Sequence, residues 1–233
     1  MKMTGREDLT LFSQVGWLAQ QSAAFREALL AQGRVISFAR GDVIYREGDE
    51  GRGLFGVIAG SVIVLIGPPR LVPRTVNLMA AGSWFGAGPV LRGGFRSVEF
   101  RAAEDSRLIL VPGSVITHLS SAHPENARAI GALAMIGHDL ATRVAAELMI
   151  PASSRRIAAI VLRIAAPDKS AAHVAADGVC VTQSQLAEMA NVSRNVANAA
   201  LVKMRRAGWI EARYNRIRVI DAAALAAFAY GED

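Results

Sequence analysis

Near the C-terminal end of the 233-residue chain, a short predicted helix begins with an arginine and two asparagines. Ser193 can cap this helix, and its first turns then present Arg194, Asn195 and Asn198. Arginine can donate hydrogen bonds to guanine O6 and N7 or to a phosphate, and asparagine can pair with adenine N6 and N7. Side chains of these types at the start of a helix are typical of a recognition helix in the major groove of DNA.

A second predicted helix precedes this one and would hold it in place. Thr182 and Gln185 have the T-x-x-Q spacing of a capping box, in which side chains and backbone N–H groups bond reciprocally. Asn191 falls between the two helices, where the backbone must be left-handed and asparagine tolerates that conformation. The positions that a helix-turn-helix buries are all apolar, namely Leu186, Ala190, Val192, Ala197 and Ala200.

The segment Trp209–Ile220 alternates apolar and polar residues around a Tyr-Asn turn, which predicts a β-hairpin wing. Residues 151–233 carry a net charge of +4, against +2 for residues 1–150, and the surplus lies between Arg194 and Arg218. Such a cluster suits a polyanion, because neutralised phosphates release counterions; the alternative is a helical hairpin with a solvated basic face. The residues that we expect to contact DNA are Thr182, Gln183, Ser193, Arg194, Asn195, Asn198, Lys203, Arg213 and Arg216.

The N-terminal half of the chain has the pattern of a small β domain. Short alternating or β-branched runs occupy residues 35–38, 43–45, 54–58, 61–66, 75–79, 97–101 and 107–111. Strands at such regular spacing predict a β-sandwich or a small barrel, and the three prolines within residues 67–73 predict a loop. In the first 30 residues, Leu18, Phe25, Leu29 and Leu30 indicate a helix in an N-terminal arm, with Ser22 as a cap.

After Pro124 the apolar residues recur with the period of a helix. The repeating positions, four and three residues apart, are Ile130, Ala134, Gly137, Ala141, Val144 and Leu148, with Leu133 and Leu140 beside them. Small residues permit close approach of two helices, so this seam predicts a parallel homodimer; the alternative is an amphipathic helix packed on its own domain. Pro151 marks a hinge, and Ser153 and Ser154 can cap a following helix over residues 156–165.

Composition and motifs exclude several other classes of protein. Apolar residues make up 52% and charged residues 20% of the chain, which predicts a soluble globular protein. We expect it in the cytoplasm and not in a membrane, because no apolar run is long enough to span a bilayer and charges fill the N-terminus. Cys180 is the only cysteine, the four histidines form no metal-binding pattern, and no catalytic motif is present, so we expect neither a metal site nor an enzyme.

Two separate stretches resemble the Crp/Fnr family of bacterial transcription regulators. Gly41–Asp49 followed by Leu54–Val62 is similar to the start of a cyclic-nucleotide-binding β-roll, and Val192–Val196 is similar to the opening of the family's recognition helix. The resemblance covers nearly the whole chain and implies an α+β fold in three parts. These are an N-terminal arm and double-stranded β-helix or jelly-roll sensor domain (1–122), a dimerisation helix (123–150) and a C-terminal winged helix-turn-helix (151–233).

The resemblance also implies an effector pocket in the roll. Cyclic-AMP-binding members have a glycine and a ribose-binding glutamate at a short helix start, then an arginine and a serine that meet the phosphate. The corresponding residues here, with one from the long helix, are Gly86, Ala87, Gly88, Arg96, Ser97 and Thr142. Ala87 stands where the glutamate would be, so three possibilities stay open: cAMP, another small anionic or nucleotide-like effector, and no effector.

The sequence therefore predicts a homodimeric, sequence-specific DNA-binding transcription regulator. An effector in the roll would shift the separation of two recognition helices, which must match half-sites about 34 Å apart. The expected partners are double-stranded DNA, a second copy of the chain and RNA polymerase. The alternatives are a small-molecule-binding module, a ligand-independent regulator, and a nucleotide-acting enzyme built around Arg96, His138 or Asp139.

Overall fold

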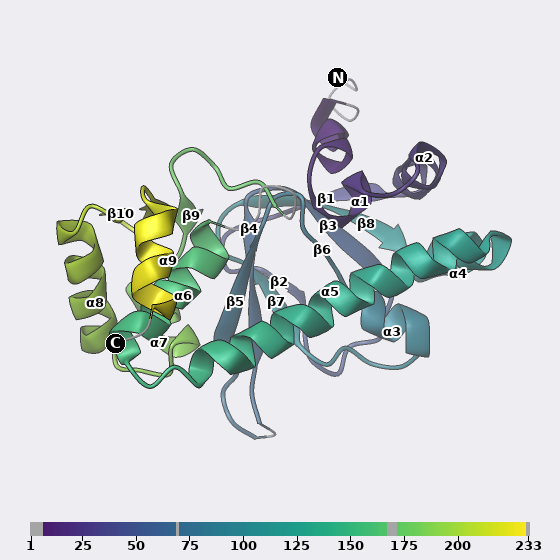
Figure 1. Ribbon diagram of the computed structural model, residues 1–233. Helices are drawn as coiled ribbons and strands as arrows, with labels where there is room; N and C mark the ends of the chain where they lie inside the picture. The colour runs from purple at the N-terminus through teal and green to yellow at the C-terminus, as the bar shows by residue number, and fades with distance from the viewer. Residues whose placement is uncertain (1–6, 69, 167–171, 232–233) are drawn as a thin grey trace. The chain divides into compact units, whose positions relative to one another are not determined.

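The computed structural model describes residues 7–68, 70–166 and 172–231 (Figure 1). Its contacts divide these residues into two compact units. One unit takes the described parts of Met1–Val62, Met79–Leu140 and Lys169–His173, and the other takes those of Ile63–Leu78, Ala141–Asp168 and Val174–Asp233. Helices and sheets both contribute to the fold, which confirms the predicted α+β class.

The N-terminal arm consists of short helices in place of one longer helix. They are the 3₁₀-helix η1 (Glu7–Ser13), α1 (Gly16–Ala19) and α2 (Ala23–Ala31). Gly16 has a φ of 80°, which breaks the helical run before α1. The predicted cap of α2 is confirmed, because the Ser22 hydroxyl accepts a hydrogen bond from the Phe25 N–H.

Eight strands among the described residues of the N-terminal half form two sheets, with the orders β1-β8-β3-β6 and β2-β7-β4-β5. Their bounds are β1 (Arg34–Phe38), β2 (Val43–Tyr45), β3 (Gly53–Ala59), β4 (Ser61–Ile66), β5 (Arg74–Ala80), β6 (Trp84–Phe85), β7 (Glu99–Ala102) and β8 (Ser106–Pro112). In the first sheet, β8 is antiparallel to β1 and β3, with Val35 opposite Ile109 and Leu54 opposite Val111. All seven predicted strands are present, and the proline-containing loop lies between β4 and β5.

Helix α3 (Ala87–Arg92) lies between β6 and β7 in the chain. Helix α4 (Gly113–Ala122) and the long helix α5 (Pro124–Leu148) follow β8. The beginning of α5 packs on its own unit, since Ile130 and Leu133 belong to the hydrophobic core there. Trp17 Nε1 also donates a hydrogen bond of 2.7 Å to the Ala129 carbonyl oxygen. Packing within one domain therefore accounts for the start of the predicted seam.

Further along α5, three of the seam positions are exposed and Val144 is half-buried. Gly137 and Ala141 are exposed, and Leu148 is 43% exposed. Met135 and Ile136 are exposed as well, although the seam did not include them. This part of α5, a helix of 25 residues, therefore exposes a strip of apolar and small residues. The dimer seam remains a prediction for this part of the helix.

The C-terminal part is built around α6 (Ser153–Ala165), in which every residue of Ile157–Ala165 is buried. The prediction that Ser153 or Ser154 caps this helix is wrong, because the helix begins at Ser153 and its N-cap, Ala152, has no side-chain cap. The remaining elements are β9 (Val179–Cys180), α7 (Gln183–Met189), α8 (Arg194–Arg206), β10 (Ile210–Arg213), β11 (Arg216–Val219) and α9 (Ala222–Tyr230). The three strands form a sheet in the order β10-β11-β9.

A buried cluster of charges ties α6 to its neighbours in the second unit. The side chain of Arg163 is 4% exposed, and its Nε lies 2.8 Å from Glu147 Oε2 at the end of α5. Arg163 also donates hydrogen bonds to the Asn77 side chain and to the Val76 carbonyl oxygen of β5. Burial lowers the pKa of Arg163, and the attraction of Glu147 opposes that shift.

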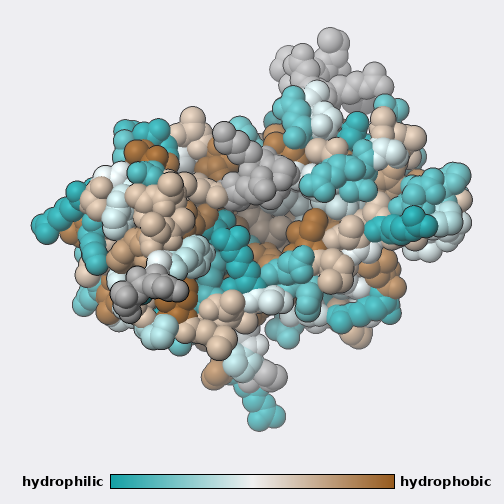
Figure 2. Space-filling view, in the orientation of Figure 1, coloured by the Kyte–Doolittle hydropathy of each residue, from teal (hydrophilic) through white to brown (hydrophobic). Residues whose placement is uncertain are grey.

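Within the part of the chain that the structure describes, no helix is both long and apolar enough to cross a membrane. On the face drawn in Figure 2, hydrophobic side chains are scattered among hydrophilic ones.

Candidate nucleic-acid interface and effector pocket

The helix-turn-helix is held by the capping interactions that the sequence predicts. Thr182 Oγ1 accepts a hydrogen bond of 3.1 Å from the Gln185 N–H, and Gln185 Oε1 accepts one of 2.8 Å from the Thr182 N–H. Asn191 has a φ of 49° at the turn, and the Ser193 hydroxyl accepts from the Val196 N–H at the start of α8. The capping box, the left-handed turn and the second cap are therefore all confirmed.

The two sides of α8 differ in burial, which identifies its outer face. Ala197, Ala200, Leu201 and Met204 are buried in the second unit. The side that carries Arg194, Asn195 and Asn198 is exposed. The structure thus brings the three predicted base-contacting residues together at the exposed start of one helix.

Gln183, at the start of α7, links two of these residues. Its Nε2 donates a hydrogen bond of 3.1 Å to Asn198 Oδ1, and its Oε1 accepts a long one of 3.5 Å from Arg194 Nε. These three residues, Gln183, Arg194 and Asn198, form a trio. The amide oxygens of Gln183 and Asn198 both face hydrogen-bond donors that belong to the trio. The sequence placed Gln183 in the interface but gave no sign of these bonds, because they join residues 15 and 11 positions apart.

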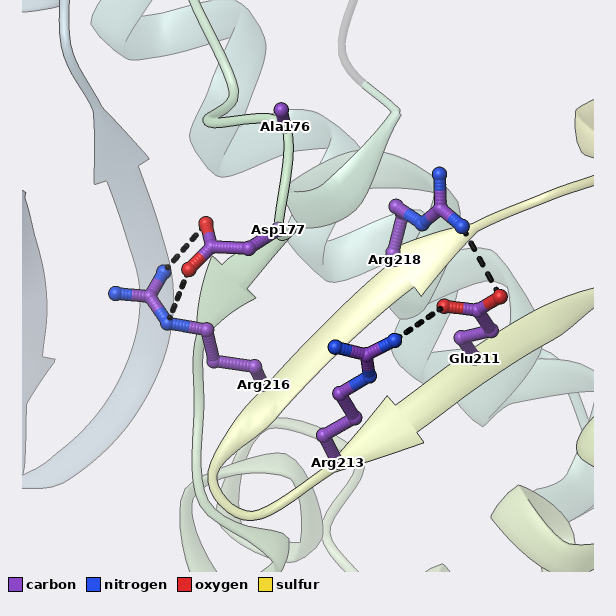
Figure 3. A pocket seen from close by; sticks show the side chains of 6 residues that line it. All are labelled: Ala176, Asp177, Glu211, Arg213, Arg216 and Arg218. Atoms are coloured by element: carbon purple, nitrogen blue, oxygen red, sulfur yellow. Dashed lines mark hydrogen bonds and ion pairs between the residues drawn. The ribbon is translucent and has the colours of Figure 1, made fainter.

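The wing has more charge pairing than the sequence indicates. Arg213 and Arg218 come from the two strands of the β10–β11 hairpin and converge on Glu211, at 3.8 and 3.0 Å (Figure 3). Arg216 turns away from them toward Asp177, and its Nε is 3.1 Å from Asp177 Oδ2. Asp177 lies outside the basic segment from Arg194 to Arg218. These side chains and Ala176 line a pocket of about 260 Å³. Two carboxylates thus neutralise part of the wing's positive charge.

Lys203 lies apart from the start of α8. Its Nζ is 4.5 Å from the centre of the Phe228 ring of α9, a cation–π distance. It follows Arg194 by nine positions in the helix, or roughly 14 Å along the axis. Lys203 can therefore contribute charge to the surface, but it lies far from the base-contacting turn.

Arg96 is the centre of the candidate effector pocket. It is 4% exposed, and its two terminal nitrogens donate hydrogen bonds to the carbonyl oxygens of Gly86 (3.0 Å) and Gly53 (2.8 Å). Its guanidinium carbon lies 4.2 Å from the centre of the Tyr45 ring. Gly86 has a φ of 98°, and a Cβ there would lie 2.7 Å from Arg96 Nη1, so only glycine fits. Arg96 is thus a buried residue and not part of a surface ion pair, and the nearby carboxylate of Glu99 pairs with Arg101.

Aromatic rings fill the interior beside Arg96. Phe85 stacks on Phe100 at 4.0 Å and on Phe55 at 5.5 Å, and Tyr45 contacts all three rings at 5.1 to 5.9 Å. Burial raises the pKa of Tyr45 and lowers that of Arg96, so desolvation acts on both partners. Sequence reasoning missed these aromatic residues as part of the site: Tyr45, Phe55 and Phe100 lie in predicted strands, but the strand pattern does not say that their rings meet.

The other predicted effector residues are not gathered around Arg96. Ser97 is exposed, and its hydroxyl accepts a hydrogen bond of 2.6 Å from Arg92. Ala87 is buried at the start of α3, whereas Gly88 is exposed. Thr142 is exposed and belongs to the other compact unit. The hydrogen bonds of the structure join only Gly86 to Arg96 among the predicted residues.

Arg96 nevertheless has an unpaired donor among its contacts with the described residues. Its buried Nε has no hydrogen-bond partner among the described residues. Asp49 lies near enough to favour the charged form, but burial outweighs it. A buried guanidinium with an unpaired donor is suited to an anion. The described residues contain no cluster of His, Cys, Asp or Glu that could hold a metal ion.

Comparison with known proteins matches both parts of the chain. The model of the cyclic nucleotide-binding domain matches residues 35–123, and that of the Crp-like helix-turn-helix domain matches residues 155–228. No curated protein matches the chain.

Several solved structures share the fold. FixK2 from Bradyrhizobium japonicum is 15% identical, with a TM-score of 0.74, over 86% of this chain and 99% of that one. The c-di-GMP responsive global regulator CLP of Xanthomonas campestris is 21% identical, with a TM-score of 0.64, over 85% and 99%. A CRP family transcriptional regulator from Thermus thermophilus, TTHB099, is 24% identical, with a TM-score of 0.63, over 83% and 96%. Since one chain joins the two matched domains in this fold, it belongs to the Crp/Fnr family of transcription regulators.

Proposed function

We propose that the chain acts as a homodimer that binds a specific DNA sequence and responds to a small anionic effector in its β-roll. The observation that carries the DNA-binding part is the exposed start of α8, where Arg194, Asn195 and Asn198 share one face. The proposed DNA contacts comprise these residues with Thr182, Gln183, Ser193, Lys203, Arg213 and Arg216. Side chains at the start of the helix would meet base edges, and those of the wing would meet phosphates.

The exposed part of α5 supports the homodimer. Met135 and Ile136 are 55% and 45% exposed, and Gly137 and Ala141 leave room for a second helix beside them. Two copies joined along α5 would present two recognition helices to two half-sites of a palindrome. A regulator of this kind would act in the cytoplasm, with RNA polymerase as its further partner.

The environment of Arg96 supports an anionic effector. A phosphate beside the buried guanidinium would satisfy the unpaired Nε and balance a buried charge. The residues fit the ribose of a cyclic nucleotide less well, because Ala87 offers no carboxylate to its hydroxyl groups. The regulator CLP is described as responsive to c-di-GMP, which supports nucleotide effectors other than cAMP.

A ligand-independent regulator is the second candidate. Arg96 donates hydrogen bonds to two carbonyl oxygens, and aromatic rings pack beside it. These contacts favour a roll whose interior is packed without a ligand. An effector would have to displace part of this packing, and it can shift the conformational equilibrium only by binding the two states unequally. Isothermal titration of the refolded, ligand-free protein with cAMP, cGMP and c-di-GMP separates the two candidates. Binding that Arg96→Ala abolishes supports the effector, and no heat with any of them favours the ligand-independent regulator.

Selection from a random pool of double-stranded DNA tests the DNA-binding proposal, with sedimentation velocity on the selected complex. We expect an enriched palindrome bound by two chains. A small-molecule-binding module would enrich no sequence, and a monomeric complex would contradict the dimer.

A further inference from the structure

We propose that Gln183 orients the amide of Asn198 so that the recognition surface presents hydrogen-bond donors, and that this orientation selects guanine over adenine at the base pair that Asn198 faces. The inference rests on the proposed DNA binding and adds the base that one position of the half-site requires. The sequence alone had predicted adenine for Asn198.

The geometry of the trio fixes which atoms face outward. Gln183 Nε2 lies 3.1 Å from Asn198 Oδ1, so the amide oxygen of Asn198 is turned toward α7. The amide group is planar, and its Nδ2 lies on the other side of the carbonyl carbon from that contact. Asn198 is exposed, so its Nδ2 and both of its N–H bonds remain open to a ligand.

The other two members of the trio also present donors. Gln183 Oε1 faces Arg194 Nε at 3.5 Å, which leaves the second N–H of Gln183 and the terminal N–H groups of Arg194. An arginine has no acceptor, and both amide oxygens are directed at donors within the trio. The outward surface of Arg194, Gln183 and Asn198 is therefore rich in donors and poor in acceptors.

The bases of DNA respond differently to such a surface. Guanine offers two acceptors in the major groove, N7 and O6, whereas adenine offers the acceptor N7 beside the donor N6. An asparagine that pairs with adenine must accept from N6 through its amide oxygen, and in Asn198 that oxygen is directed at Gln183. One bidentate pair separates right from wrong bases by about tenfold in affinity.

Asn195 provides the contrast within the same turn. Its side chain makes no hydrogen bond to the described residues, so its amide can turn to present either its oxygen or its nitrogen. The constraint thus falls on Asn198 alone. A guanine requirement is expected at one position of the half-site, and adenine remains open to Asn195.

The experiment measures base preference by fluorescence anisotropy on the DNA selected from the random pool. Each base pair of one half-site is replaced by the other three, and the position that Asn198→Ala makes indifferent is the one that Asn198 faces. At that position we expect the native chain to prefer guanine over adenine by about tenfold. The native chain should lose this preference when 7-deazaguanine, which lacks N7, replaces the guanine.

Two variants of Gln183 then test its part. In Gln183→Ala the Asn198 amide is free to turn, so the guanine preference should fall to within about twofold at that position only. In Gln183→Glu the carboxylate accepts from Nδ2 and turns Oδ1 outward, so the preference should move to adenine or cytosine, whose amino groups donate. Ser184→Ala, at the neighbouring exposed position of α7, is the matched control and should retain the native preference.

The outcomes separate this inference from the function on which it rests. If the pool yields no enriched sequence, the proposed DNA binding fails. If a sequence is enriched but the native chain prefers adenine at the Asn198 position, or Gln183→Ala keeps the full guanine preference, the orientation by Gln183 is overturned and the DNA binding stands. An Asn198→Ala variant that alters no position also overturns it.

Discussion

The roll and the recognition surface each contain an arginine that the sequence assigns to a ligand, and the two lie in opposite surroundings. Arg96 in the roll is 4% exposed and donates to two backbone carbonyl oxygens. Arg194 on α8 is exposed and makes one long contact, 3.5 Å, with Gln183. One arginine is thus part of the packed interior, and the other is held on the surface with no hydrogen bond from its terminal nitrogens to the described residues.

This difference has consequences for how each site can act. A surface whose donors are already open can bind DNA without rearranging the interior of its unit. A ligand that reaches Arg96 must compete with the carbonyl oxygens of Gly86 and Gly53 and with the ring of Tyr45. Effector binding at Arg96 would therefore change the packing of the roll, which is what a sensor domain requires.

The largest effect is expected at a third arginine, Arg163, which extends the comparison to a buried ion pair. Arg163→Ala removes the buried partner of Glu147 and Asn77 and leaves Glu147 only the half-exposed Arg143, so the free energy of unfolding should fall by about 3 to 5 kcal/mol. Urea denaturation monitored by circular dichroism measures it. The control is Arg143→Ala, because Arg143 contacts the same carboxylate but is 52% exposed, and about 1 kcal/mol or less is expected. Equal losses in the two variants would contradict the argument from burial.

The local features of the fold were predictable because neighbouring residues encode them. The capping box of Thr182 and Gln185 and the cap at Ser193 need only residues three positions apart. The strands likewise follow from short runs of β-branched residues between turns. The start of α6 was missed, because a serine at its first position can equally be read as a cap one residue earlier.

The partners of the charged residues could not be predicted, because they come from distant parts of the chain. Arg96 donates to Gly53, 43 positions away, and Arg163 donates to Asn77, 86 positions away. A pattern of residue types says that an arginine is present but not which carbonyl or carboxylate the fold brings to it. The same limit applies to Arg216, whose partner Asp177 lies outside the cationic segment.

A substitution of Arg96 sharpens the comparison. Arg96→Met keeps an apolar chain of similar length but leaves the Gly53 and Gly86 carbonyl oxygens without their donors. We expect a loss of about 2 to 3 kcal/mol in the free energy of unfolding, since a hydrogen bond from a charged donor contributes about 1.5 to 3 kcal/mol. Chemical denaturation without added nucleotide measures it. An unchanged stability would mean that Arg96 is held for a ligand and contributes nothing to the packing of the roll.

Arg194→Ala should differ from Arg96→Met in that it lowers the affinity for DNA and leaves the stability nearly unchanged. The side chain is exposed, so the free energy of unfolding should stay within about 0.5 kcal/mol of the native value. Affinity for the selected DNA should fall by about tenfold or more and the discrimination against other sequences should narrow, because a base contact is lost. Anisotropy with specific and scrambled DNA measures both. Unchanged affinity and specificity would show that α8 is not the recognition helix.

The smallest effect is expected in the wing, where the charge is already partly paired. Arg216 lies 3.1 Å from Asp177 and also donates to the Gly178 carbonyl oxygen, so it enters a phosphate contact only by sharing its donors. Arg216→Ala should therefore weaken binding to all sequences alike, and the slope of log affinity against log salt should become shallower by less than the unit expected for one free phosphate contact. Asp177→Asn is the matched variant: it frees Arg216 from its carboxylate and should steepen the slope. A change in base preference in either variant would mean that the wing reads bases, and the division between a reading helix and a phosphate-binding wing would then have to be abandoned.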